Sequence, residues 1–461
     1  FHRGFSRVLF RGVYCYSALL FEKELENLMQ KIKHKNPLLF TGFECSKIVY
    51  GCRQDGTEDV LATTAHDKRF RSDLRRVKEA GVTFVRCPVP WHRIEREPGR
   101  YDWKWLDAYM AAYREFGLIP IADLAHHTAI PSYLKYGYAD PEFVGRFMAF
   151  VREFYARYPW IEWVTPINEP CATAHLCDVG YWDRHKPDYW LIIKQMGQAI
   201  CASSRFLHER GVKVMHTDPA QHFQVRKRKN RYLAEARNEW RFTEIELFLG
   251  LISESDPRHA ELLERYGFNR EELKWFRKNP AHIDVYALDY YMHCELLLDH
   301  EGKAPPARGL APIFLDYYER LGQQCPAMQF AIGEFNVREN VFGRLTWAKF
   351  ILEEARTIWE KLGDRYFGTC AYPFIDCTDW CSCLRHPNRN IDPQGMFLWV
   401  EEGTLRRVKS LLFRWMSDYA KGKVSEADFP VYGFSADMHN RPDRLLWRFE
   451  RWGVKEIIRG L

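Results

Sequence analysis

Two glutamates in this 461-residue chain stand in short motifs that suit acid–base chemistry. The tripeptide Asn-Glu-Pro at 168–170 and the tripeptide Gly-Glu-Phe at 333–335 each follow a short apolar run. Both runs are rich in strand-favouring residues, so we expect Glu169 and Glu334 at strand ends. Two carboxyl groups about 5–5.5 Å apart can cleave a glycosidic bond with retention, one as nucleophile and one as acid and then base.

A third strand-like run is followed by an arginine, Arg86. A charge at such a place is expected to be buried and to need a partner, and a carboxylate fits that need. A simpler interpretation competes for Glu169, because a carboxylate at a helix start is favourable in itself. The strand-end placement and the neighbouring Asn168 favour the catalytic interpretation.

Eight short strand-like runs alternate with amphipathic helical segments from about residue 38 onward. This alternation predicts parallel strands joined by right-handed crossovers, and eight units can close into a (β/α)8, or TIM, barrel. Active sites of such barrels lie at the carboxyl ends of the strands, so the barrel would bring both glutamates to one face. The predicted strands are residues 38–42, 83–87, 119–124, 163–167, 212–216, 285–289, 329–333 and 369–374.

The motifs together resemble glycoside hydrolase family 1, the β-glucosidase-like family of clan A. Residues 165–170, Thr-Pro-Ile-Asn-Glu-Pro, are similar to the family's T-x-N-E-P box with one extra residue. The resemblance covers roughly residues 36–420 and implies a carbohydrate substrate. It also implies that Glu169 is the acid/base, that Glu334 is the nucleophile and that Asn168 binds the sugar 2-hydroxyl.

Two further landmarks follow in the family's order. Residues 85–94 are similar to R-F-S-I-S-W-x-R-I, which implies that Arg86 keeps the nucleophile ionised. Residues 124–127 resemble L-x-H-W, which places His126 at the sugar 3-hydroxyl. Because adjacent strand residues point to opposite faces, we expect only one of His126 and His127 to face the barrel mouth and the other to pack.

Later segments continue the resemblance. Asp-Tyr-Tyr at 289–291 is similar to N-Y-Y, which implies that Tyr291 hydrogen-bonds the nucleophile, with Tyr290 as the adjacent alternative. Residues 368–380 can be laid without gaps on the family's strand-eight segment, and residues 395–409 resemble its closing motif.

The expected sugar-recognition residues depart from the family's pattern. The strand-one glutamine is absent, and Glu44 or Lys47 would take its place. Tyr372 stands where the family has a sugar-stacking tryptophan, and Asp379 replaces the glutamate that grips the 4- and 6-hydroxyls, while Trp380 is retained. We therefore expect a divergent relative whose sugar need not be glucose.

The function that these residues predict is a retaining β-glycosidase. A transglycosidase would use the same two glutamates with a sugar acceptor in place of water, and a non-catalytic carbohydrate-binding barrel is the alternative from another class. A 6-phospho-glycosidase is less favoured, because residues 381–388 lack that subgroup's Ser-x-Lys-x-Tyr phosphate grip.

Three segments are predicted around this core. Residues 1–35 indicate an N-terminal helical extension, residues 36–420 the catalytic barrel, and residues 421–461 a C-terminal appendage packed on it. The polar, helical stretch 217–283 is the longest excursion between strands, and we expect it over the active-site face.

Composition narrows the classes of protein further. The net charge of +6 is slight for this length, and the basic run 226–229 lacks interleaved aromatic residues, so neither predicts a nucleic-acid partner. No apolar run reaches the roughly 18 residues that span a bilayer. The 13 cysteines lack paired spacing, which indicates free thiols in a reducing, cytoplasmic compartment. The group Cys377, Cys381 and Cys383 lacks the second pair that a zinc site needs, so we expect no metal or cofactor.

Overall fold

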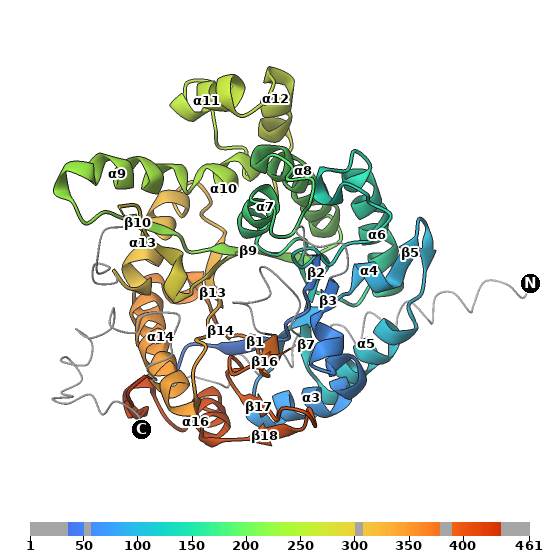
Figure 1. Cartoon of the computed structure of the whole chain (residues 1–461), viewed down its shortest axis with the longest axis vertical. Helices are drawn as coiled ribbons and strands as arrows, with labels where there is room; N and C mark the ends of the chain where they lie inside the picture. Colours follow the sequence, from blue (N-terminus) through green and yellow to red (C-terminus); the bar gives the residue numbers. More distant parts are fainter. Residues whose placement is uncertain (1–35, 50–56, 300–307, 379–389, 435–461) are drawn as a thin grey trace, which may run out of the picture.

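The predicted barrel is confirmed. The structure, a computed structural model, describes residues 36–49, 57–299, 308–378 and 390–434. Eight parallel strands close into a barrel ringed by helices (Figure 1). The order of the strands around the barrel follows the chain, and the last strand pairs with the first. The barrel strands are β1 (Leu39–Gly42), β4 (Phe84–Pro88), β7 (Ile119–Asp123), β8 (Trp163–Thr165), β9 (Lys213–Pro219), β11 (Val285–Asp289), β13 (Gln329–Glu334) and β14 (Tyr366–Ala371). Every strand predicted from the sequence overlaps one of them.

The barrel interior is filled by large side chains. Phe84 on β4 and Trp163 on β8 meet edge to face although β7 lies between their strands, so their rings cross the lumen. Parallel strands buried on both faces are mostly apolar, which is why the strand-like runs could be predicted from the sequence. The interior cluster consists of Phe40, Phe84, Ile119, Ile121, Trp163, Met215, Val285, Ala287, Ala331, Cys370 and Tyr372.

A larger apolar layer lies between the strands and the surrounding helices. The longer helices of this ring are α3 (His66–Ala80), α5 (Lys104–Phe116), α6 (Phe143–Arg157), α8 (Tyr189–His208), α13 (Leu310–Leu321), α14 (Val341–Leu362) and α16 (Leu411–Ala420). Shorter helices are α2 (Val60–Thr63), α4 (Trp91–Ile94) and α7 (Pro170–Asp178), with 3-10 turns at η1 (Gly137–Ala139), η3 (Met292–Cys294), η4 (Gly363–Arg365) and η5 (Glu426–Asp428).

Short two-stranded ladders decorate the loops of the barrel. They pair β2 (Lys47–Val49) with β3 (Thr57–Asp59), β5 (Glu95–Glu97) with β6 (Arg100–Tyr101), β10 (His222–Gln224) with β12 (Glu295–Leu297), β15 (Cys377–Thr378) with β16 (Ile391–Asp392), and β17 (Leu398–Val400) with β18 (Arg407–Lys409).

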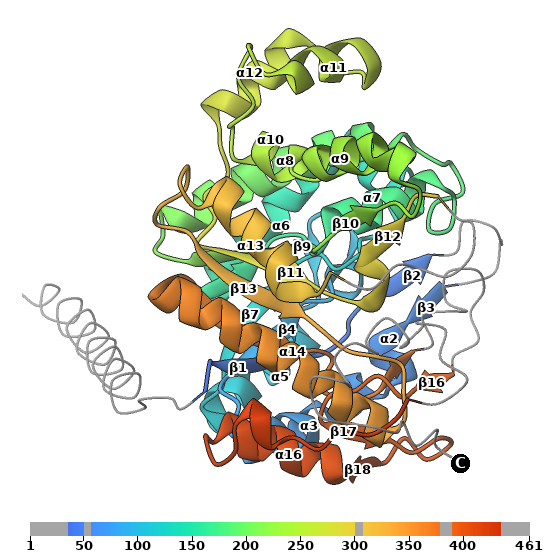
Figure 2. The same cartoon turned by 90° about the vertical axis from the view of Figure 1, so that its left-hand side faces the viewer.

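The excursion between β9 and β11 is helical, as predicted, but its expected place is wrong for its outer part. It contains η2 (Arg228–Asn230), α9 (Arg231–Trp240), α10 (Thr243–Phe248), α11 (Pro257–Arg265) and α12 (Arg270–Lys278). In both views α11 and α12 project outward beyond α8 instead of covering the barrel mouth (Figures 1 and 2). A Cβ at Gly197 of α8 would lie 2.4 Å from the Phe248 ring and 3.0 Å from the Phe276 ring. The excursion is therefore anchored on α8, away from the lumen.

The chain after α16 packs against α14. Lys349 of α14 donates from Nζ to the Glu426 and Ala427 carbonyls at 3.0 and 2.9 Å. At the other end, the Asn36 side chain donates to the Val424 carbonyl at 2.7 Å. The predicted extension 1–35 and residues 435–461 of the predicted appendage lie outside the described residues, so these domain boundaries stay predictions. Among the described residues, no helix has the length and apolarity to cross a membrane.

Candidate active site

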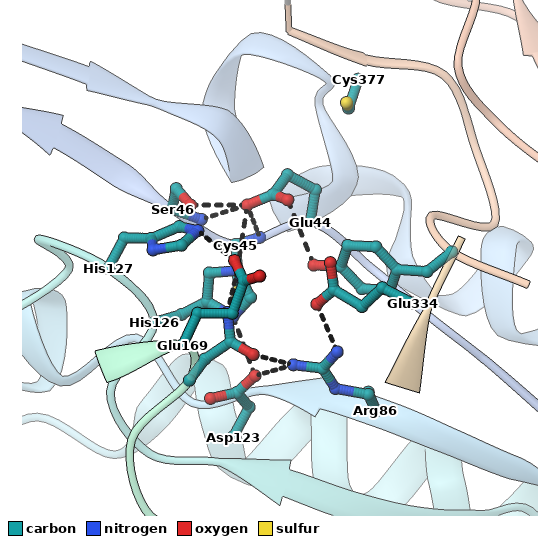
Figure 3. Close-up of polar contacts among 12 residues, drawn as sticks. Glu44, Cys45, Ser46, Arg86, Asp123, His126, His127, Glu169, Glu334 and Cys377 are labelled. Atoms are coloured by element: carbon teal, nitrogen blue, oxygen red, sulfur yellow. Dashed lines mark hydrogen bonds and ion pairs between the residues drawn. The ribbon is translucent and has the colours of Figure 1, made fainter. Parts of the chain in front are cut away.

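The carboxylate of Glu334, at the end of β13, is held from both sides. Arg86 of β4 donates from Nη1 to Glu334 Oε1, and the Tyr291 hydroxyl donates to Oε2 at 2.5 Å (Figure 3 shows the Arg86 contact). Burial raises the pKa of Glu334, while the Arg86 guanidinium and then His126 act in the opposite direction. The structure thus brings Arg86 and Tyr291, the two groups that the sequence predicted around this carboxylate, into contact with it.

Arg86 connects Glu334 to the opposite wall of the site. Its Nη2 donates to Asn168 Oδ1 at 2.5 Å and to Asp123 Oδ2 at 3.0 Å. The same Asp123 oxygen lies 2.8 Å from His126 Nδ1. Sequence reasoning missed Asp123, although it ends β7 three residues before the predicted His126, and the strand-end rule could have found it.

Glu169 occupies a strained turn between β8 and α7. Its φ of 41° lies in the left-handed region, and the helix begins at the next residue, Pro170. Non-glycine residues held in this region cluster at functional sites. Burial, then the neighbouring carboxylates of Glu334 and Asp218, raise the pKa of Glu169 well above its usual range. Glu169 therefore has the environment of a proton donor.

The expectation that only one of the two adjacent histidines faces the mouth is wrong. His127 has a φ of 47°, which breaks the alternation of an extended strand. His126 Nε2 lies 3.4 Å from Glu44 Oε1, and His127 Nε2 lies 3.6 Å from Glu169 Oε2. Both rings lie beside the candidate catalytic residues (Figure 3).

The two predicted catalytic carboxyl groups face one another. One oxygen each from Glu169, Glu334 and Asp289, the last residue of β11, all lie within 4.8 Å of one another. Retaining glycosidases hold their carboxyl groups about 5–5.5 Å apart and inverting ones about 6.5–9.5 Å apart. The separation of Glu169 and Glu334 suits the retaining geometry. Asp289 is a third carboxyl group that the sequence did not single out.

Glu44 lies in the site, on the loop after β1. Its Oε1 accepts from the Ser46 hydroxyl at 2.6 Å and from the Ser46 and Cys45 N–H groups at 2.9 and 3.0 Å. The Tyr372 hydroxyl donates to Glu44 Oε2 at 3.2 Å. Glu44 therefore has a fixed position beside His126, as a replacement for the absent glutamine would need.

Tyr372 also packs on the central arginine. The Arg86 guanidinium lies 5.0 Å from the centre of the Tyr372 ring. A Cβ at Gly42 would lie 2.8 Å from this ring and from Arg86 Cβ, so only glycine fits at the end of β1. The predicted contact of Tyr372 with the sugar stays a prediction, and the predicted Asp379 and Trp380 lie outside the described residues.

Three clusters among the described residues bring metal-type donor atoms within 4.8 Å of one another. In the first, Asp123 and His126 already bind each other at 2.8 Å, beside Cys45. The second is the carboxyl trio at the catalytic centre, and the third, His208, His282 and Asp284, lies outside the site on partly exposed residues. The prediction from the sequence that the protein needs no metal stays a prediction.

Comparison with known proteins supports the expected resemblance. Residues 63–144 match the model of glycoside hydrolase family 42, described as β-galactosidase. The β-galactosidase BgaA of a Thermus species is 43% identical over 51 residues, and the Thermus thermophilus β-galactosidase is 42% identical over 52 residues. Each match covers only 11% of this chain and 8% of the relative.

Solved structures match over most of the chain. A Thermotoga maritima β-glucosidase in complex with castanospermine superposes with a TM-score of 0.68 at 17% identity, covering 84% of this chain and 98% of that one. The family 1 β-glucosidase of the same organism superposes with a TM-score of 0.67 at 18% identity and the same coverage. The chain thus has the fold of these β-glucosidases, as the motifs predicted.

Proposed function

We propose that this protein is a retaining β-glycosidase that hydrolyses a β-linked carbohydrate by double displacement. One observation carries the proposal: carboxyl oxygens of Glu169, in the turn after β8, and of Glu334, at the end of β13, lie within 4.8 Å of one another. The similarity to segments of β-galactosidases and to the fold of β-glucosidases supports it. This double displacement requires no metal or organic cofactor.

In the first step, Glu334 Oε attacks the anomeric carbon and forms a covalent ester with the sugar. The bond from this carbon to the leaving oxygen breaks, and that oxygen takes the proton of Glu169. In the second step, Glu169 removes a proton from water, the water oxygen bonds to the anomeric carbon, and the ester bond to Glu334 breaks. Both glutamates return to their starting states.

The surroundings of the two glutamates suit these unequal roles. Glu334 receives a guanidinium N–H and a phenol O–H, which favour its charged, nucleophilic form. Glu169 faces His127, and burial lowers the pKa of that histidine well below its usual range, so it is a neutral neighbour. Environments that separate the pKa values of two carboxyl groups are the usual way to assign acid and nucleophile.

The proposal is tested by Glu334→Gln with a panel of aryl β-glycosides that includes glucosides, galactosides and glucosaminides. We expect kcat to fall by about 10³-fold or more on every accepted substrate, because no carboxylate remains to attack. Glu115→Gln, which breaks an exposed ion pair with Arg71, is the matched control and should keep full activity. Thermal unfolding of both variants checks that they are folded. Unchanged turnover by Glu334→Gln would refute the proposal.

A covalent label separates the alternatives. A slowly turned-over 2-fluoro glycoside should add one sugar to Glu334, detected by mass spectrometry of the digested protein. Sugar binding without labelling or turnover would instead identify a non-catalytic carbohydrate-binding barrel. Products that grow in chain length when a sugar acceptor is added would identify a transglycosidase.

A further inference from the structure

Asp289 ends β11 inside the candidate site and has no visible structural task. It is fully buried, and neither carboxyl oxygen has a hydrogen-bond partner among the described residues. Leaving a buried polar group unsatisfied is unfavourable, and the penalty is larger for a charge. A buried, unpaired carboxyl group that points into a catalytic site indicates a partner that arrives with the ligand.

The strands beside Asp289 offer it no donor. On one side β11 pairs with β9, where Pro219 lies opposite Asp289 and has no N–H to give. On the other side it pairs with β13, where Glu334 lies opposite and is itself an acid. A Cβ at Gly333 would lie 2.2 Å from Asp289 Oδ1, so the glycine makes the room that this side chain occupies.

The three carboxyl groups surround one point. Because one oxygen each from Glu169, Asp289 and Glu334 lies within 4.8 Å of the other two, some point lies within about 2.8 Å of all three. This is the length of a charge-assisted N–H···O hydrogen bond. A protonated primary amine carries three donors and a positive charge, whereas a hydroxyl has one donor. An ammonium nitrogen therefore fits this point better than a hydroxyl oxygen does.

The charge of the site also favours a cation. Two cationic side chains, Arg86 and His126, face a larger number of acids, and the pKa of His126 is raised well above its usual value despite the opposing effect of burial, by Cys45 and the nearby carboxylates. The buried acids of the site are Glu44, Asp123, Glu169, Asp289 and Glu334. Burial, then Glu334 and Glu169, raise the pKa of Asp289 well above its usual range.

We infer that the Glu169–Asp289–Glu334 trio binds the ammonium group of a 2-amino-2-deoxy-β-glycoside, an inference that rests on the proposed function. Since Glu334 attacks the anomeric carbon, the substituent on the next ring carbon is the sugar group that lies beside this carboxylate. A neutral 2-hydroxyl would leave Asp289 without enough donors, and a 2-acetamido group would bring bulk and no charge.

The test compares aryl β-glucosaminide with aryl β-glucoside at pH 6, where the amine is protonated. We expect the wild-type kcat/KM to favour the glucosaminide, and Asp289→Asn to lower that ratio by about 10- to 100-fold through the amino substrate. Glu115→Gln is the control: Glu115 forms an exposed ion pair with Arg71 outside the site. It should leave the ratio unchanged. A ratio that Asp289→Asn does not change would overturn the inference.

Binding separates a failure of this inference from a failure of the proposed function. Glucosamine and glucose are titrated calorimetrically into wild type and Asp289→Asn. Stronger binding of glucosamine that Asp289→Asn abolishes supports the amine site even where no glycoside is turned over. Equal binding of the two sugars overturns it even where glucosides are hydrolysed. Inhibition of glucoside turnover by Ca²⁺ that Asp289→Asn relieves would show a metal at this point and also overturn it.

Discussion

Asp376 and Asp289 are both buried aspartates that follow or end a barrel strand, and they have opposite surroundings. Asp376 is 1% exposed and accepts from Arg344 Nη1 at 2.7 Å and from the Gly395 and Val400 N–H groups at 2.8 and 2.9 Å. Asp289 is 0% exposed and accepts from no donor within the part of the chain that the structure describes. The two side chains are thus equally buried, but Asp376 has hydrogen-bond donors for both carboxyl oxygens and Asp289 has none among the described residues.

This difference indicates that the Asp376 carboxylate holds parts of the fold together, whereas the Asp289 carboxyl group is available to bind a ligand. Arg344 lies on α14, and its Nη1 also donates to the Gly395 carbonyl at 2.6 Å, so the pair ties this helix to the loop before β17. Within the described ranges, the Asp289 side chain forms no hydrogen bond that would tie two elements together. We conclude that Asp376 stabilises the fold, and we expect Asp289, buried without a donor among the described residues, to oppose stability.

The largest expected effect is on the stability of the protein and comes from replacing Asp376. Asp376→Asn removes the charge that Arg344 faces, and breaking a buried pair from one side is destabilising by about 3–5 kcal/mol. We expect the free energy of unfolding in urea to fall by about 3 kcal/mol, with the variant retaining its barrel fold. Glu115→Gln breaks an ion pair that is half exposed on both sides and should change stability by about 1 kcal/mol or less. Equal effects of the two variants would contradict the assignment.

The next effect concerns Glu334, whose surroundings are intermediate between those of the two aspartates. It accepts hydrogen bonds from Arg86 and Tyr291, but it also faces the acids Glu169 and Asp289. Tyr291→Phe removes the hydroxyl that donates to Glu334 Oε2. A hydrogen bond to a charged group is worth about 1.5–3 kcal/mol, so we expect kcat/KM to fall by about 10- to 100-fold. Losing this donor should also raise the pKa of Glu334, so the acid limb of the pH–kcat/KM profile should move to higher pH. Tyr290→Phe is the neighbouring control, since the Tyr290 hydroxyl donates to Glu295 instead.

An unchanged acid limb in Tyr291→Phe would contradict the role of Tyr291 at the nucleophile. A shift in Tyr290→Phe of the same size would show that the effect comes from general disturbance of the loop after β11.

The sequence predicted the parts of the site that depend on strand ends. Glu334 and Arg86 each lie at or near the carboxyl end of an apolar strand, and that position alone fixes the face on which they meet. Glu169 needed one more step, because its strand ends at Thr165 and a left-handed turn sets the direction of the side chain. The spacing of apolar residues along the sequence does not predict such a turn.

What the sequence could not predict depends on backbone irregularity and on contacts distant in the chain. His127 enters the site because of its positive φ, which the alternation rule cannot anticipate. The place of α11 and α12 follows from how Phe248 and Phe276 pack on Gly197 of α8, a contact across about 50 to 80 residues. The isolation of Asp289 follows from which residues lie opposite it on two neighbouring strands, and only the barrel register gives that.

The smallest expected effect tests whether Asp289 opposes stability. Asn at position 289 stays neutral at every pH, whereas the wild-type carboxyl ionises near pH 3.9 in the unfolded chain and at a higher pH in the folded one. Well below a pH of about 3.9, the carboxyl group is protonated in both the folded and the unfolded wild-type chain. As the pH rises above that value, only the unfolded chain gains a solvated carboxylate, so wild type loses stability relative to Asp289→Asn. We expect the gap in unfolding free energy to widen by about 1 kcal/mol between pH 4 and pH 5. Urea unfolding of both proteins at each pH measures it. A gap that stays constant would mean that Asp289 ionises as easily in the folded protein as in the unfolded chain, and that it has a partner after all.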